Sequence, residues 1–306
     1  MLGRLIGVCA GVTLGVLVSG CAENADPAGA SPGASEGVVM TTFHPTTWIA
    51  ERLAGGLVEV ECPLPEGEDP IFWKPPAEVI RRYQEADLIV VNGAELEKWV
   101  ATAALPRSRV VDSCAELSVE LITIESSTHS HGPAGEHSHD GIDGHTWVDP
   151  LLAVEQAERI TEAMSEAFPE HTEAFETNLA TLRDELRLLD AQLSEIDLAG
   201  VSLIASHPAY NYLARRHGWG IESLDLDPEG ELSDADVMDV VAHVRPGTRG
   251  VLLWEGPPLE ASVGRLEQAG ITSVVFSPAE NPGEGEGDYL SIMRENIERL
   301  RAGVGG

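Results

Sequence analysis

Basic residues are scarce in this chain. Lys and Arg together number 19, against 51 Asp and Glu, which gives a formal net charge of −32 at pH 7 over 306 residues. Proteins that bind phosphate backbones need clustered Lys and Arg, so this composition excludes nucleic acid as a partner. An acidic surface attracts cations weakly and is more often a feature that keeps a protein soluble.

Long apolar runs are also lacking. The most apolar stretch follows Arg4 and covers residues 5–18, which is too short to cross a bilayer comfortably. It ends at "LVSGC", which resembles a bacterial lipobox and predicts a signal peptide over residues 1–21 with lipidation at Cys21. A plain secretory peptide with an incidental cysteine is the alternative. Residues 22–36 are rich in Gly, Ala, Ser and Pro and predict a flexible tether between anchor and fold.

Cysteines and catalytic motifs are few. The four cysteines include no CxxC pair, which argues against a thiolate zinc site. Cys62 and Cys114 each follow a predicted strand, and the sequence leaves open whether they form a disulfide. The chain has no HExxH motif, and it has no GxSxG nucleophile elbow between a predicted strand and a predicted helix. It therefore lacks the signatures of zinc proteases and of α/β hydrolases.

Histidine, by contrast, is concentrated in one place. The stretch "HSHGPAGEHSHDGIDGHTWVDP" has no apolar period with which to build a core. Neutral imidazole is the commonest metal ligand in proteins. We therefore predict a His-rich surface loop over residues 125–144 that attracts metal ions, with an ordinary solvated loop as the alternative. The histidines of this loop are His129, His131, His137 and His139.

From residue 37 onward, short β-rich runs alternate with amphipathic runs. Runs such as "GVVMTTF", "DLIVVN" and "GVLLWE" predict strands. Runs such as "PTTWIAERLA", "AELEKWVATA" and "SDADVMDVVAHVR" predict helices. Such alternation predicts an α/β fold, in which parallel sheets are flanked by helices.

The second half of the chain repeats the first. "TTFHPTTWIAERLAGG" and "IASHPAYNYLARRHGWG" both predict a strand, a His-Pro pair and a helix. We therefore predict two similar lobes, each with a four-stranded parallel sheet, over residues 37–168 and 198–306. Leucines recur between them at steps of four and three, which predicts one long rigid helix over residues 169–197. Because ligands of such sheets bind beyond the carboxyl ends of the strands, we expect a site in a cleft between the lobes.

Candidate metal ligands follow the predicted strands. His44 and His207 end the first strand of each lobe, Glu255 ends "GVLLWE", and His145 precedes "TWVDP". Two or three imidazoles with a carboxylate suit Zn²⁺, and a shell with more oxygen suits Mn²⁺. Each residue also has a simpler explanation, since a histidine can cap a helix and a carboxylate at a strand end can be solvated. Asp149 precedes a proline and is predicted to cap a helix.

Several of these motifs together resemble a known family. The chain is similar, over about residues 37–303, to the cluster A-I substrate-binding proteins of bacterial zinc and manganese ABC importers. The resemblance implies two lobes linked by one long helix, with a metal between them held by His145 and His207. It also implies a His-rich loop like that of the zinc-binding members, and no enzymatic activity. The motifs that carry it are "TTFHPTTWIAERLAGG", "EADLIVVNGAELEKWV", "GHTWVDPLLAVEQAERI", "ASHPAYNYLARRHG" and "GDYLSIMRENIERL".

Two positions depart from the family pattern. Ile71 stands where the resemblance implies another histidine, and Ser277 stands near the position of the last carboxylate, with Glu280 close by. The internal repeat makes His44 our candidate for the missing imidazole. Asp69 or Glu68 could supply oxygen instead.

The leading hypothesis is an extracytoplasmic receptor, anchored by lipid in the periplasm or on the cell surface. It would capture Zn²⁺, or alternatively Mn²⁺, and deliver it to the permease and ATPase of an ABC importer. We expect it to be a monomer. A metal-buffering or adhesin-like lipoprotein with a degenerate site is the second hypothesis, and a zinc hydrolase is the third.

Overall fold

The computed structural model describes residues 37–65, 67–124, 141–280 and 288–305, and it describes the backbone alone for residues 128–130 and 136–138. The predicted signal peptide and tether, with Cys21, therefore lie outside the described residues. The same holds for His131 and His139, and for the side chains of His129 and His137. The account below concerns the compact unit to which these described residues belong.

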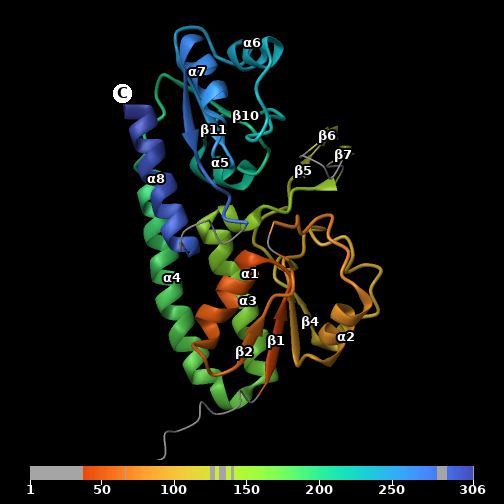
Figure 1. Ribbon diagram of the computed structural model, residues 1–306. Helices are drawn as coiled ribbons and strands as arrows, with labels where there is room; N and C mark the ends of the chain where they lie inside the picture. Colours follow the sequence, from red (N-terminus) through yellow and green to blue (C-terminus); the bar gives the residue numbers. More distant parts are fainter. Residues whose placement is uncertain are drawn as a thin grey trace, which may run out of the picture. The chain divides into compact units, whose positions relative to one another are not determined.

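The N-terminal lobe is built on a four-stranded parallel sheet. Its elements are β1 Val38–Thr41, α1 His44–Ala54, β2 Glu59–Glu61, α2 Ala77–Glu85, β3 Leu88–Val91, a 3₁₀ turn Arg107–Arg109 and β4 Val110–Asp112. The strand order is β2-β1-β3-β4, with Val39 opposite Leu88 across the central pair (Figure 1). All four residues of β3 are buried, as expected for a strand covered on both faces.

The C-terminal lobe repeats this plan. Its elements are β9 Val201–Ala205, α5 Asn211–His217, β10 Ile221–Ser223, α6 Asp234–Ala242, β11 Arg249–Trp254, α7 Glu260–Gln268 and β12 Ile271–Val275. The strand order is β10-β9-β11-β12, which matches the order of the first sheet position by position. The predicted α/β fold with two four-stranded parallel sheets is confirmed.

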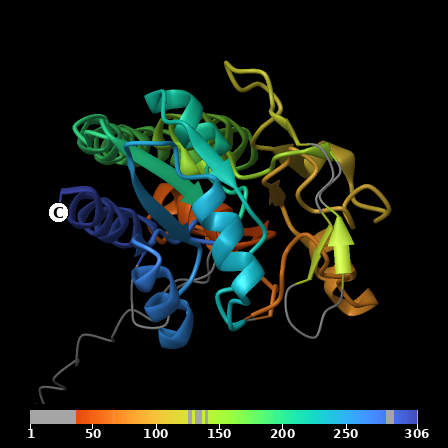
Figure 2. The same ribbon diagram turned by 90° about the horizontal axis from the view of Figure 1, so that it is seen from above.

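Three helices form the spine of this unit. They are α3 Pro150–Ala167, α4 Thr172–Ser194 and α8 Tyr289–Gly305, with a 3₁₀ turn Pro169–His171 between the first two. Helix α4 has 23 residues and is therefore about 35 Å long. It packs against α1, α3 and α8, and both views show α4 and α8 side by side (Figures 1 and 2). Its buried face consists of residues spaced by the steps of four and three that the sequence shows, namely Phe175, Leu179, Leu182, Leu186, Leu189 and Leu193.

One apolar cluster runs through both lobes. It includes Val39 and Val90 of the first sheet, Leu186 of α4, and Leu203 and Leu253 of the second sheet, all 2% exposed or less. The long helix thus contributes to a core that both sheets share. Within the described residues, no helix combines the length and the apolar composition needed to cross a bilayer.

The predicted helix over "AELEKWVATA" is wrong, because this segment forms turns. Ala94 and Glu95 adopt positive φ angles of 50° and 61°, which a right-handed helix does not allow. The Glu97 carboxylate is buried and accepts hydrogen bonds from the backbone N–H of Asn92 at 2.7 Å and of Gly93 at 3.3 Å. These bonds satisfy the buried carboxylate and fold the backbone back on itself.

The question of a disulfide between Cys62 and Cys114 is settled by the structure, because both are free thiols. The Sγ atom of Cys114 lies 3.2 Å from Thr146 Oγ1, and burial raises the pKa of this thiol to about 12. Cys114 therefore acts as a small buried side chain next to the loop that carries His145.

The predicted His-rich loop contains short antiparallel ladders. Strand β5 Thr123–Ile124 pairs with β8 Gly141–Ile142, and β6 Thr128–Ser130 pairs with β7 Glu136–Ser138. The second pairing places His129 opposite His137 in register. The first brings the chain back to the lobe just before His145.

Candidate metal centre

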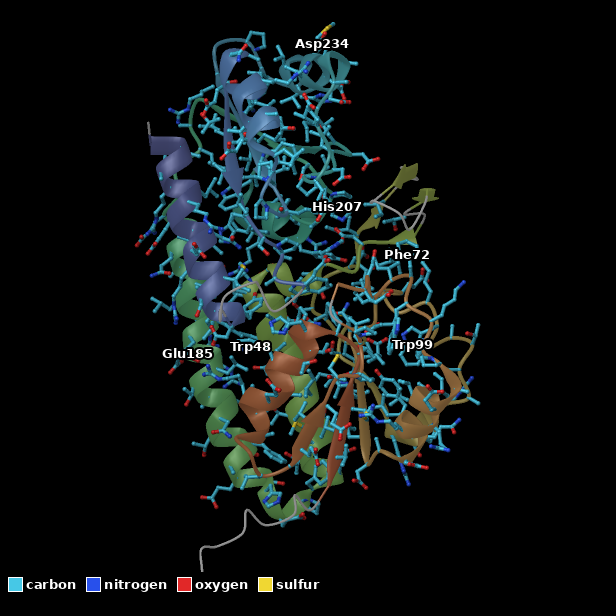
Figure 3. All side chains as sticks on the ribbon, viewed as in Figure 1. Trp48, Phe72, Trp99, Glu185, His207 and Asp234 are labelled. Carbon is cyan, nitrogen blue, oxygen red and sulfur yellow. The ribbon has the colours of Figure 1, made fainter. Side chains whose placement is uncertain are left out.

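Three loops meet where the two lobes face each other. They are the loop after β8, which carries His145, the turn from β9 to α5, which carries His207, and the loop after β12, which carries Glu280. Figure 3 shows His207 between the upper lobe and the lower lobe. Trp147 Nε1 donates to Pro278 O at 2.7 Å and so binds the first loop to the third.

Two tyrosines of the His207 segment complete these connections. Tyr210 donates its hydroxyl to Phe276 O at 2.6 Å, and Tyr212 donates its hydroxyl to Asp143 O at 2.8 Å. Both rings are fully buried. The three loops are therefore held to one another by buried hydrogen bonds, which fixes the positions of the polar side chains that they carry.

His145 is buried between two carboxylates. Its Nδ1 atom lies 2.7 Å from Asp143 Oδ1, and its Nε2 atom lies 3.0 Å from Glu280 Oε1. Burial lowers the pKa of this imidazole, but the hydrogen bonds with Asp143 and Glu280 outweigh it and raise the pKa to about 10. Without a metal, His145 therefore carries a proton at neutral pH.

His207 faces His145 from the other lobe. The two ring centroids are 5.4 Å apart with an interplanar angle of 78°, and His207 Nδ1 lies 3.8 Å from Glu255 Oε2. Burial, followed by the negative charge of Glu280, raises the pKa of Glu255 to about 8. Two imidazoles and two carboxylates are thus gathered in one small volume.

This set has the chemistry of a site for a divalent cation. A zinc ion about 2.0–2.1 Å from each ligating nitrogen would lie about 3 Å from each ring centre, so two rings 5.4 Å apart can share one ion. Across the described residues, no three such side chains already stand in a metal-holding arrangement. Among His145, His207, Glu255 and Glu280, the shortest contact joins His145 Nε2 to Glu280 Oε1 at 3.0 Å.

Ile71 lies beside His145, at the position where the resemblance implies a histidine. Both residues line a small cavity of about 30 Å³, together with Asp143 and Gly144. An aliphatic side chain offers no lone pair, so Ile71 itself contributes no ligand. Asp69 is exposed, and its Oδ1 atom accepts a hydrogen bond from Ile71 N at 2.8 Å.

His44 occupies the first position of α1 and is half-buried. Burial lowers its pKa, and the charge of Asp288 partly counteracts this. No described contact joins His44 to His145, His207 or Glu255, whereas those three are linked to one another and to Glu280. Ligation by His44, and by Asp69 or Glu68, stays a prediction.

Ser277 forms hydrogen bonds that hold the loop after β12 in place. Its backbone N–H donates to Asn296 Oδ1 at 2.9 Å, and its hydroxyl accepts from Ala279 N at 3.1 Å. The turn that follows places Ala279 at a φ of 61°, a strained conformation for a residue with a side chain. This strained turn directs Glu280 towards His145.

Sequence reasoning missed the role of Asp143. This aspartate looked like part of the polar His-rich tract, but it is 1% exposed and is the partner of His145 Nδ1. The available signal was its place two residues before His145 in "DGH".

Asn92 also supports this loop, since its Nδ2 atom donates to Gly144 O at 3.0 Å. The predicted helix cap at Asp149 is confirmed by its bond from Leu151 N at 2.9 Å.

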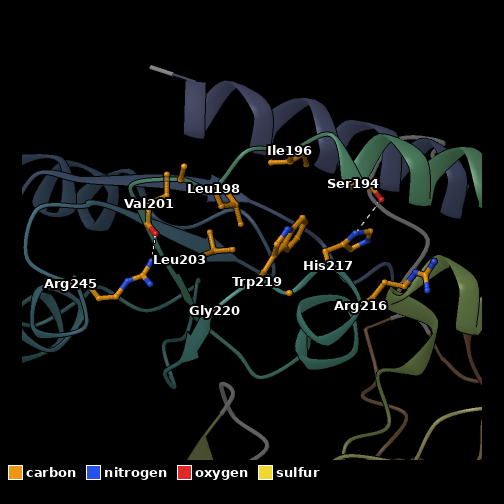
Figure 4. A pocket seen from close by; sticks show the side chains of 12 residues that line it. Ser194, Ile196, Leu198, Val201, Leu203, Arg216, His217, Trp219, Gly220 and Arg245 are labelled. Carbon is orange, nitrogen blue, oxygen red and sulfur yellow. Dashed lines mark hydrogen bonds between the residues drawn. The ribbon is translucent and has the colours of Figure 1, made fainter.

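A separate cavity of about 560 Å³ lies at the C-terminal end of α4 (Figure 4). Trp219 and His217 line it, and His217 Nδ1 lies 3.4 Å from Ser194 Oγ. None of the four residues gathered between the lobes lines this cavity. It is therefore distinct from the candidate metal centre.

Comparison with known sequences gives matches over most of the chain. The family model described as zinc-uptake complex component A, periplasmic (ZnuA), matches residues 39–303. The zinc-binding lipoprotein AdcA of Streptococcus pneumoniae is 28% identical over 277 residues, which cover 86% of this chain and 55% of that protein. This chain thus spans about half the length of its streptococcal relatives.

One further relative and one solved domain of AdcA match over nearly their whole length. The high-affinity zinc uptake system protein ZnuA of Bacillus subtilis is 25% identical over 300 residues, which cover 94% of this chain and 93% of that protein. The crystal structure of the Zn(II)-bound ZnuA-like domain of S. pneumoniae AdcA superimposes with a TM-score of 0.73 at 25% identity. That match covers 88% of this chain and 99% of the solved one.

Proposed function

This chain belongs to the family of periplasmic zinc-uptake complex component A proteins, and from that premise we propose that it captures Zn²⁺ outside the cytoplasm. It would deliver the ion to the permease and ATPase of an ABC importer. The observation that carries this proposal is the meeting of His145, His207 and Glu280 between two lobes. Because this family consists of solute-binding proteins, the activity is binding and release, and the zinc hydrolase hypothesis is not retained.

The ion would be held by His145, His207, Glu280 and Glu255. A shell with three histidines would have one more nitrogen ligand. Here Ile71 stands in place of the third histidine, and a carboxylate oxygen takes its share of the coordination. Zn²⁺ accepts such a mixture of nitrogen and oxygen, and Mn²⁺ is the alternative ion for an oxygen-rich shell. His44 remains our candidate for an additional imidazole.

The test is calorimetric titration and metal analysis of the full chain purified in detergent. Removing one ligand should weaken zinc binding by more than the roughly ten- to hundredfold that changes behind the ligands typically cost. We expect this loss for His145→Ala and His207→Ala, and for His44→Ala if His44 is a ligand. The control is His243→Ala, because His243 is the C-terminal cap of α6 and its Nδ1 atom lies 2.8 Å from Asp239 O. Normal binding by all three variants would end the receptor proposal.

A metal buffer with a degenerate site is a second candidate, because Ile71 supplies no ligand beside His145. The two functions differ in affinity and in genetic context. A receptor should bind one zinc ion tightly and be encoded beside a permease and an ATPase. A buffer should bind several ions weakly and lack such neighbours.

The lipid anchor and the His-rich loop complete the proposal. Lipidation at Cys21 would hold the receptor at the membrane, because two or more acyl chains anchor a protein stably. We expect the anchored receptor to be a monomer. Cys21→Ser should then release it from the membrane fraction, and unchanged membrane association would refute this anchor.

The loop histidines would raise the local metal concentration, so deleting residues 129–139 should remove weak zinc sites and leave the tight site intact. Loss of the tight site in this deletion would contradict the separation of loop and centre.

A further inference from the structure

The Asp143 carboxylate receives hydrogen bonds from both lobes. Its Oδ1 atom accepts from the backbone N–H of His145 at 2.9 Å and lies 2.7 Å from His145 Nδ1. Its Oδ2 atom accepts from Asn211 Nδ2 at 2.9 Å. Each carboxylate oxygen therefore serves a different lobe, because His145 belongs to the N-terminal lobe and Asn211 begins α5 of the C-terminal lobe.

A second hydrogen bond also joins α5 to Asp143. Tyr212 donates its hydroxyl to the carbonyl oxygen of Asp143 at 2.8 Å, and the same hydroxyl accepts from Ile122 N at 3.0 Å. The backbone and the side chain of Asp143 are thus both held by α5. Asp143 is 1% exposed, so these bonds are shielded from water.

We propose that Asn211 is a positioning residue that ties the orientation of the His145 imidazole to closure of the two lobes, so that lobe separation releases the metal. This inference rests on the proposed function and concerns the regulation of that same site. When α5 is withdrawn, Asp143 loses its partner on Oδ2, and the imidazole that Asp143 orients becomes free to turn. A partner that separates the lobes would thereby weaken zinc binding without touching a ligand.

Asn211 is hydrogen-bonded to the surroundings of both histidines. It lies in the segment that begins with His207, and its Nδ2 atom also donates to Pro208 O at 3.1 Å. The amide group thus joins the turn next to His207 to the carboxylate behind His145. Withdrawal of this segment moves one imidazole and removes the support of the other in a single step.

The inference requires the amide donor and not merely a side chain of that size. An aspartate at position 211 has nearly the same shape, but it has no N–H group and would place a carboxylate against Asp143. Replacement by alanine removes the donor without adding a charge. Because changes behind a metal ligand typically cost about ten- to a hundredfold in affinity, both variants should release zinc at least about tenfold faster. The Asn211→Asp variant should be the more affected.

The experiment measures zinc release from the full chain by stopped-flow mixing with an excess of a chelator. The visible absorption spectrum of the Co²⁺-substituted protein is recorded alongside, because it reports ligand geometry and does not respond to a general loss of stability. The matched control is Asn178→Asp, in which the lost donor bonds only Leu53 O on the side of α4. This control should release zinc at the wild-type rate, with an unchanged Co²⁺ spectrum.

A double-mutant cycle identifies the route of the effect. Asp143→Ala should itself speed zinc release, and adding Asn211→Asp to it should cause no further change. Equal release rates for wild type and Asn211→Asp would overturn the inference, and so would a full additional loss in the Asp143→Ala background. A wild-type chain that binds no zinc would instead overturn the proposed function, so the two failures are distinguishable.

Discussion

His145 and Glu280 come from opposite lobes, and the imidazole Nε2 atom lies 3.0 Å from the carboxylate Oε1 atom. Sequence patterns alone favoured Glu255 as the carboxylate of the site, because it directly ends a strand. In the structure, Glu255 is the neighbour of His207, with 3.8 Å between Nδ1 and Oε2. Glu280 is therefore the neighbour of His145 and Glu255 that of His207, and the two carboxylates are close enough for Glu280 to raise the pKa of Glu255.

Exchange of these carboxylates for amides should reveal their separate contributions. Glu280→Gln should weaken zinc binding by at least about a hundredfold, since it neutralises a ligand in contact with His145. Glu255→Gln should cost about tenfold or more through the loss of a second negative charge next to His207. Calorimetric titration measures both, with the exposed Glu267→Gln on α7 as a control of equal charge change. If Glu280→Gln binds like wild type, the carboxylate ligand is a different residue.

Zinc affinity should rise with pH across the neutral range. The metal displaces the proton of His145, whose pKa is about 10, and that of Glu255, whose pKa is about 8. Each displaced proton makes the apparent affinity about tenfold higher per pH unit. An ordinary imidazole would confine this dependence to pH values near 6.5 and below, so titrations at pH 6, 7 and 8 separate the two cases. A constant affinity between pH 7 and 8 would contradict this description of the centre.

The metal-free protein should show the opposite trend in stability. Both groups have pKa values raised by folding, so the folded state retains protons that the unfolded state has lost. The stability contributed by His145 is therefore complete below pH 6.5 and is lost as the pH rises towards about 10, and that of Glu255 is lost between about 4.5 and about 8. The difference in Tm between the zinc-bound and zinc-free protein should widen from pH 6 to pH 8. Glu255→Gln should reduce this widening.

A histidine at position 71 should strengthen the site. Ile71 lines the same small cavity as His145, so Ile71→His should add a nitrogen ligand where Ile71 supplies none. We expect zinc affinity to rise by about tenfold or more, on the scale that ligand environment changes produce. The control is Leu259→His, which introduces an imidazole at an exposed position in the C-terminal lobe. An affinity that stays at the wild-type value would show that position 71 does not reach the ion.

The long helix α4 should be a main source of stability. Leu186 is fully buried in the core that both lobes share, so Leu186→Ala should lower the free energy of unfolding by about 2–5 kcal/mol. Leu188 lies on the same helix but is 53% exposed, and Leu188→Ala should change it by less than about 0.5 kcal/mol. Denaturant titration of the two variants provides the comparison. Similar losses in both would contradict the assignment of the buried face.

Local sequence determined the framework of this protein. Alternation of β-rich and amphipathic runs is a short-range property, and it predicted both parallel sheets and the helix α4 with its stripe from Phe175 to Leu193. His145 and His207 became candidate ligands because they lie in motifs at the ends of regular elements, and their ligation stays a prediction. These features depend on periodicity and on neighbouring residues, so the chain itself displays them.

Tertiary structure alone decided how the site is assembled. The segment after Gly93 has a helical composition, yet the buried carboxylate of Glu97 draws the backbone into turns. Asp143 pairs with His145 locally, but only the tertiary structure brings Asn211 of α5, in the other lobe, to its second carboxylate oxygen. Glu280 approaches His145 only because the chain turns at Ala279 and Trp147 holds the loop at Pro278. The contacts of Asp143 with Asn211, of His145 with Glu280 and of Trp147 with Pro278 join residues far apart in the chain. The bonds of Glu97 and the pair Asp143–His145 are short-range, but their energies also depend on burial that exists only after the chain has packed.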